Sequence, residues 1–127
     1  MPEKEKTTAA SHGSTPNLAD YDEACSTFSW KQVRDELSGL PDGRGFNIAY
    51  EAVDHHADGI QEGKIALRWI GTEGATQELT YLDLKEQTNR FANVLESLPI
   101  QKGEVVCTLT GRIPELYITA LGTLKIA

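Results

Sequence analysis

The stretch that decides the fold is residues 80–127, TYLDLKEQTNRFANVLESLPIQKGEVVCTLTGRIPELYITALGTLKIA, which predicts a helix, a strand and a second helix. Apolar residues recur every three or four positions in residues 80–98, which is typical of an amphipathic helix. Thr80 is expected to cap this helix together with Asp83, and Pro99 to end it. The apolar stripe consists of Tyr81, Leu84, Thr88, Phe91, Leu95 and Leu98.

Residues 105–109 (VVCTL) show little alternation of apolar and polar side chains, which favours a strand covered on both faces. Pro114 is suited to the first position of the second helix. The broad apolar face of that helix comprises Leu116, Tyr117, Ala120, Leu121 and Leu124. No later strand follows to pair with residues 105–109, so we expect a fold cut short, with Leu116, Tyr117, Leu121 and Leu124 exposed in the isolated chain.

The sequence before residue 80 predicts a series of short elements. Residues 1–17 have no large apolar side chain after Met1 and are expected to form a mobile tail. A helical turn is expected in residues 18–28, beginning near Asp20, and a helix in 30–37, capped by Ser29. A turn-rich loop in 38–45 precedes a helix in 48–57, which is capped by Asn47 and has a modest apolar face including Ile48 and Val53. A strand in 65–70, a turn in 71–75 and a second strand around 77–80 follow.

These elements predict an α/β fold. Lead-in helices and a β-hairpin precede the first helix–strand–helix of an incomplete, mostly parallel sheet subdomain. We expect three regions: the tail in residues 1–17, a helical lead-in segment in residues 18–64, and the hairpin with the start of the α/β subdomain in residues 65–127.

Composition excludes several classes of partner. The net charge is −7, and residues 18–64 carry ten acidic side chains against four basic ones, which argues against nucleic acid or an anionic membrane as a partner. No apolar run approaches 18 residues, and the N-terminus lacks the apolar core of a secretory signal. Cys25 and Cys107 lie far apart in sequence. Their spacing leaves a disulfide open, but two reduced thiols in a cytoplasmic protein are favoured, with Cys107 in the buried strand.

Three groups of residues are candidate functional sites. His55 and His56, with Glu51 and Asp58, suggest a metal site, but adjacent helical residues point about 100° apart, so we expect a solvated helix surface. The GxG at residues 43–45 does not follow a strand and is expected to be a plain turn. The corner at residues 108–112 places Gly111 and Arg112 before a helix N-terminus, where anions bind in some α/β folds, but a simple turn with a solvated arginine is favoured.

No phosphate loop, nucleophile elbow, Ser/His/Asp set or carboxylate pair is recognisable in the 127 residues. We therefore assign no catalytic, cofactor-binding or metal-binding residue to this chain.

From about residue 17 onward, the sequence resembles the N-terminal part of AMP-forming acetyl-CoA synthetases, members of the adenylate-forming acyl-activating superfamily. The order and spacing of several blocks make the resemblance specific. The blocks are NLADYDE at 17–23, FSW at 28–30, NIAYEAVD at 47–54 with His56, ALRW at 66–69, Thr80-Tyr81 with Leu84, TNRFANVL at 88–95, KGEVV at 102–106 and RIPELY at 112–117.

The resemblance implies the function of a much longer enzyme. Such ligases form acetyl-AMP from acetate and Mg-ATP and then transfer the acetyl group to CoA, so the implied substrates and cofactors are acetate, ATP, Mg²⁺ and CoA. The family's phosphate loop, acetate pocket and adenylation lysine have no counterpart in residues 1–127. The implied role of this chain is therefore scaffolding, without activity of its own. A free-standing interaction module and a decayed, truncated gene product are the alternatives.

Overall fold

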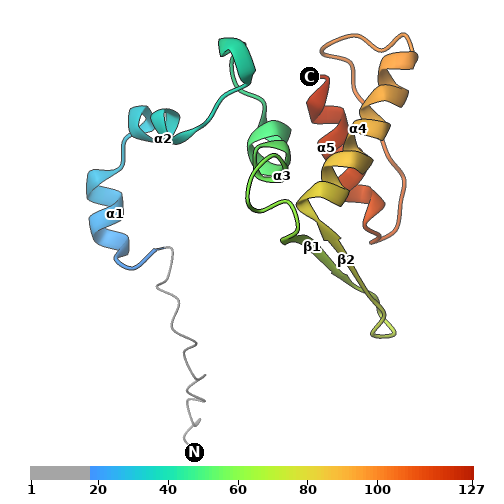
Figure 1. Ribbon diagram of the computed structural model, residues 1–127, viewed down its shortest axis with the longest axis horizontal. Coiled ribbons are helices and arrows are strands. Elements are labelled where there is room, and N and C mark those ends of the chain that lie inside the picture. Colours follow the sequence, from blue (N-terminus) through green and yellow to red (C-terminus); the bar gives the residue numbers. More distant parts are fainter. Residues whose placement is uncertain (1–17) are drawn as a thin grey trace, which may run out of the picture. The chain divides into compact units, whose positions relative to one another are not determined.

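The computed structural model describes residues 18–127, which form two compact units (Figure 1). One unit ends at Arg34, and the other runs from Asp35 to Ala127. The tail predicted in residues 1–17 lies outside the described residues. The boundary predicted between residues 64 and 65 stays a prediction.

The predicted lead-in helices are confirmed. Helix α1 spans Tyr21–Thr27, and the carboxylate of Asp20 caps it by accepting a hydrogen bond of 2.9 Å from the Glu23 N–H. Helix α2 spans Trp30–Glu36. Neither of these helices contains a buried residue, so contacts within the described residues give them little apolar stabilisation.

The helix predicted in residues 48–57 is present, but its middle is wound as a π-helix. The π-helical turn, η2, spans Tyr50–Asp54, and α3 continues it over His55–Ala57. Its packed face is formed by residues four apart, Ala49, Val53 and Ala57, which are all nearly inaccessible to solvent. Ile48, which the sequence placed on the apolar face, is 64% exposed because it lies one position away from this stripe. A short 3₁₀ turn, η1 (Pro41–Gly43), precedes the helix.

The predicted β-hairpin is confirmed. Strands β1 (Ile65–Ile70) and β2 (Thr76–Thr80) pair in antiparallel register, with Arg68 opposite Glu78. The side chains of this cross-strand pair form an ion pair of 2.5 Å between Arg68 Nε and Glu78 Oε1. A bulge between Ile65 and Leu67 shifts the register near the start of β1.

Helix α4 spans Tyr81–Ser97 and begins with the predicted cap. The Thr80 hydroxyl accepts from the Asp83 N–H at 3.1 Å, and the Asp83 carboxylate accepts from the Thr80 N–H at 2.9 Å, which together form a capping box. Leu84, Thr88, Ala92 and Leu95 are the buried residues of α4. The helix ends at its C-cap, Leu98, immediately before Pro99, as predicted.

Helix α5 spans Glu115–Lys125 and packs along α4 (Figure 1). Its buried residues are Ile118 and Gly122, which do not belong to the apolar face named from the sequence. Of that face, Leu116, Tyr117 and Leu124 are 38–51% exposed, as expected for the isolated chain. Leu121 differs, because it is partly buried against the core cluster. Val53, Leu79, Leu84 and Ile118 form the centre of this cluster, with Ala66, Leu67, Phe91 and Leu121 packed around it.

The strand predicted in residues 105–109 is not formed. The sheet within residues 18–127 consists of β1 and β2 alone, so the backbone of residues 105–109 has no ladder partner there. Val105 and Leu109 are 85% and 103% exposed, and Cys107 is exposed rather than buried. The mixed helix-and-strand fold class is confirmed, whereas the parallel sheet is not seen in the described part of the chain.

The close contact between α4 and α5 depends on Gly122. A Cβ atom at this position would lie 2.9 Å from the Thr88 carbonyl oxygen and 2.9 Å from Phe91 Cδ1. We expect Gly122→Val to lower the free energy of unfolding by about 2–3 kcal/mol, because the helices must separate to admit the side chain. Urea denaturation measures this change. Ala120→Val on the exposed face of α5 is the matched control, and an equal loss in both variants would contradict the prediction.

The capping box of α4 makes stability depend on pH. Hydrogen bonds from Thr80, the side-chain bond first and the backbone bond second, hold the pKa of Asp83 below its ordinary value of 3.8. The ionised carboxylate therefore stabilises the fold above that pH, and this stabilisation disappears as the pH falls through the lower pKa of the folded state.

Accordingly, we expect Asp83→Asn to be less stable than the original chain at about pH 7, by about 1 kcal/mol, the usual contribution of a helix cap. The difference should close in strong acid. Denaturation curves across this pH range measure it, and a stability difference that does not change with pH would refute the role of the Asp83 charge.

Candidate functional site

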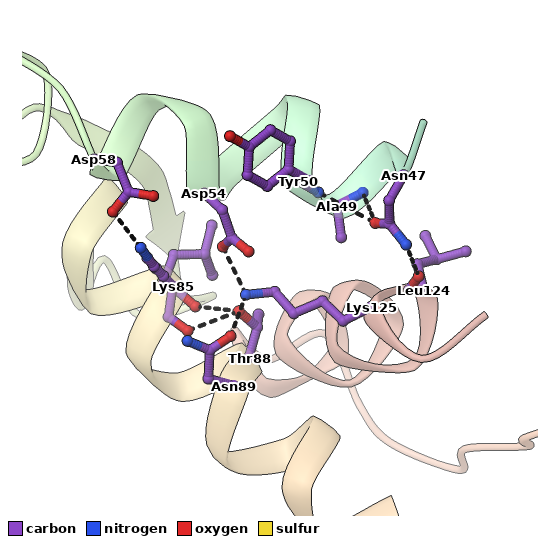
Figure 2. Close-up of polar contacts among 11 residues, drawn as sticks. Asn47, Ala49, Tyr50, Asp54, Asp58, Lys85, Thr88, Asn89, Leu124 and Lys125 are labelled. Carbon is purple, nitrogen blue, oxygen red and sulfur yellow. Dashed lines mark hydrogen bonds and ion pairs between the residues drawn. The ribbon is translucent and has the colours of Figure 1, made fainter. Parts of the chain in front are cut away.

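The best-developed polar cluster of the described residues joins three helices around Lys125 (Figure 2). Lys125 Nζ donates to Asp54 Oδ1 at 2.6 Å and to Asn89 Oδ1 at 2.5 Å. The side chains of Lys125 and Asp54 are only 9% and 16% exposed. Because both charges are largely removed from water, each depends on the other for compensation.

Asn47 makes a second connection to the same end of α5 (Figure 2). Its Oδ1 accepts from the Ala49 and Tyr50 N–H groups at 2.9 and 3.2 Å, which caps the helix of residues 48–57. Its Nδ2 donates to the Leu124 carbonyl oxygen at 2.7 Å. One amide side chain therefore satisfies backbone groups at the start of one helix and at the end of another.

Asp58 and Lys85 form an ion pair between the end of α3 and α4. Beside it, the fully buried Thr88 donates its hydroxyl hydrogen to the Leu84 carbonyl oxygen at 2.7 Å, with the Lys85 carbonyl oxygen at 3.0 Å. In the described residues, no buried side-chain nitrogen or oxygen lacks a hydrogen-bond partner. The cluster is thus suited to holding helices together, and offers a ligand little unused bonding capacity.

His55 and His56 make separate contacts. The rings of His55 and His56 are 5.3 Å apart between centroids, and the two side chains have different neighbours. His55 Nε2 lies 3.3 Å from the Ser38 hydroxyl, whereas the His56 ring lies against Tyr81 at 4.9 Å. Within residues 18–127, no three His, Cys, Asp or Glu side chains gather in a way that could hold a metal ion.

The other two candidate sites lie in turns. Residues 43–45 begin at Gly43, the last residue of η1, with positive φ angles of 68° at Gly43 and 103° at Gly45, and Arg44 Nε donates to the Pro41 carbonyl oxygen. This is the turn that the sequence indicated.

At the corner of residues 108–112, the Trp69 indole N–H donates to the Arg112 carbonyl oxygen at 2.6 Å. This bond ties the hairpin to the segment before α5. An open hollow beside it is lined by Trp69, Ile70, Gly71, Thr72 and Arg112. Cys25 and Cys107 are both free and exposed. None of the described helices is long and apolar enough to cross a membrane.

Sequence reasoning missed the cluster around Lys125. Asp54 and Lys125 are 71 positions apart, and Asn47 and Leu124 are 77 apart. No short motif brings such residues together. The available signal was the single lysine of α5, in its last turn, a position that helix dipoles favour but that does not identify the partner.

Comparison with known proteins shows the family to which this chain belongs. Residues 53–127, more than half of the chain, match the family described as AMP-binding enzyme. Acetyl-coenzyme A synthetase of Bacillus subtilis is 35% identical over 87% of this chain, and that of Methanothrix soehngenii is 42% identical over 66%. The matched regions are 19% and 13% of those two proteins, so the chain spans a fifth or less of their length.

A solved structure agrees with the sequence matches. The crystal structure of Brucella canis acyl-CoA synthetase superposes with a TM-score of 0.70 at 36% sequence identity. The alignment covers 84% of this chain and 19% of that one. The resemblance inferred from the sequence blocks is confirmed, and the chain belongs to the AMP-binding enzyme family.

Proposed function

We propose that this chain is the N-terminal structural part of a cytoplasmic acetate–CoA ligase. The whole enzyme would form acetyl-AMP and pyrophosphate from acetate and Mg-ATP, and then transfer the acetyl group to CoA. The observation that carries this proposal is the match to proteins named acetyl-coenzyme A synthetase over as much as 87% of this chain. The chain spans only 19% of that relative, so most of the groups that the reaction needs would lie in the rest of the ligase.

The polar contacts of residues 35–127 support the same division of roles. Lys125 of α5 bonds to Asp54 of η2, and Asn47, at the start of the same helix as Asp54, bonds to the Leu124 carbonyl of α5. These bonds hold the end of α5 in place. A reaction centre needs groups that are free to bind substrate and that change their interactions in the transition state. A largely buried lysine engaged by a carboxylate and an amide serves better as a fixed support.

In the whole ligase, residues 105–109 would become a strand paired with residues outside this chain. Their exposed backbone and the apolar side chains of Val105 and Leu109 support this assignment. An open groove of about 320 Å³ runs between this segment and α5, lined by Val106, Thr108, Leu116, Thr119, Ala120, Thr123 and Leu124. The missing sheet would cover it.

We expect the purified 127-residue chain to show no acetate-dependent exchange between pyrophosphate and ATP. The native polypeptide that carries this sequence should catalyse this exchange under the same conditions. Radiolabelled pyrophosphate measures both rates. Exchange above background by the 127-residue chain would refute the structural role, and absence of exchange in the native polypeptide would refute the ligase assignment.

Intact-mass measurement of that native polypeptide distinguishes the alternatives. A mass several times 13.9 kDa fits a whole ligase. A mass equal to 13.9 kDa would instead favour a free-standing interaction module or a decayed gene product.

Removing the Lys125 charge tests the scaffold directly. We expect Lys125→Met to lower the free energy of unfolding by about 2–4 kcal/mol, because Asp54 is left with a largely buried and uncompensated charge. The double variant Lys125→Met/Asp54→Leu should recover part of this loss. Lys102→Met in an exposed turn is the matched control. In the native ligase, kcat per folded molecule should stay unchanged in the Lys125 variant, and a selective loss of kcat would contradict a purely structural role.

A further inference from the structure

The carboxylate of Glu51 holds a part of the backbone that precedes its own helix. Glu51 Oε1 accepts from the Gly39 N–H at 2.6 Å, and Oε2 accepts from the Ser38 N–H at 3.2 Å. Both oxygens of one side chain are therefore used on two consecutive backbone groups. Glu51 lies in η2, the same π-helical turn that buries Val53 in the core. The packing of Val53 therefore fixes the backbone that carries Glu51.

The segment held by Glu51 is largely exposed to solvent. Residues 41–46 are all exposed, and Ser38 is exposed as well. The Leu40 N–H donates to the Gly45 carbonyl oxygen at 2.7 Å, which closes the loop on itself without attaching it to the helix. The Ser38 hydroxyl lies 3.3 Å from His55 Nε2, one helical turn beyond Glu51. Gly39 has a φ of +71°, a conformation that glycine adopts without strain.

The contact between Glu51 and Ser38 lies near the start of the larger compact unit. The smaller compact unit ends at Arg34, and Ser38 follows four residues later, so the Glu51 contact lies where the chain enters the larger unit. Loss of the contact would release the amides of Ser38 and Gly39 from the helix of residues 48–57. The buried contacts of α4 and α5 would be unaffected, because none of them involves this loop.

We propose that Glu51 is a carboxylate latch. It fixes Ser38 and Gly39 to the helix of residues 48–57, and it opens as a local unit while the core of the larger unit stays folded. Local opening of this kind is expected where buried apolar contacts are few and the hydrogen bonds are exposed.

Amide hydrogen exchange at Ser38 and Gly39 tests the latch, because these two amides are its donors. In the native polypeptide that carries this chain, we expect Glu51→Gln to accelerate exchange of both amides at least tenfold. The substituted side chain keeps its size but has one acceptor oxygen and an NH₂ group that cannot accept. Amides within α4 should exchange at the original rate. Glu62→Gln, at an exposed position, is the matched control and should change neither set.

Trypsin cleavage after Arg44 provides a second readout of the same loop. We expect faster cleavage at this site in Glu51→Gln than in the original protein or in Glu62→Gln. Unchanged exchange at Ser38 and Gly39 would overturn the proposal. Equal acceleration at the latch and throughout α4 would also overturn it, because the effect would then reflect a loss of global stability rather than local opening.

Discussion

The larger unit depends on the close approach of α5 to α4 at Gly122. The absence of a side chain there allows the backbone of α5 to come near the Thr88 carbonyl oxygen and the Phe91 ring. One turn earlier, this approach brings Ile118 into the core cluster. Three residues later, it brings Lys125 within reach of Asn89 and Asp54. The apolar packing of Ile118 and the polar bonds of Lys125 thus both depend on the close approach that Gly122 allows, and all three residues lie on one face of α5.

The Lys125–Asp54 pair adds definition more than net stability. Burying two charges costs free energy that their mutual attraction must offset, so such a pair is weak evidence of stabilisation by itself. The pair instead disfavours other positions of α5 along α4. If α5 slid or rotated by one residue along α4, Lys125 would lose both acceptors, and Gly122 would leave the point of closest approach as well. The Asn47 amide acts in the same sense, because it engages the Leu124 carbonyl and the start of another helix together.

Features fixed by neighbouring residues were predictable from the sequence. The capping box of Thr80 and Asp83 and the Asn47 cap join residues at most three positions apart, and the two hairpin strands are linked by the short turn at residues 71–75. The strand in residues 105–109 failed because a strand is defined by its partner, and β propensity alone supplies none. The Lys125 cluster was missed for a related reason. Its members are common polar residues that become informative only after the fold places them together.

The exposed apolar surface follows from the same contrast between local and distant contacts. Helices α4 and α5 bury one face by packing on each other and on the hairpin, and this much is complete within the larger unit. The opposite face of α5 and residues 105–109 remain largely exposed within residues 18–127, which is consistent with the proposed pairing to a sheet formed by strands outside this chain. The matched region is at most about a fifth of the length of the relatives, and in the proposed ligase the remaining sequence would supply those strands.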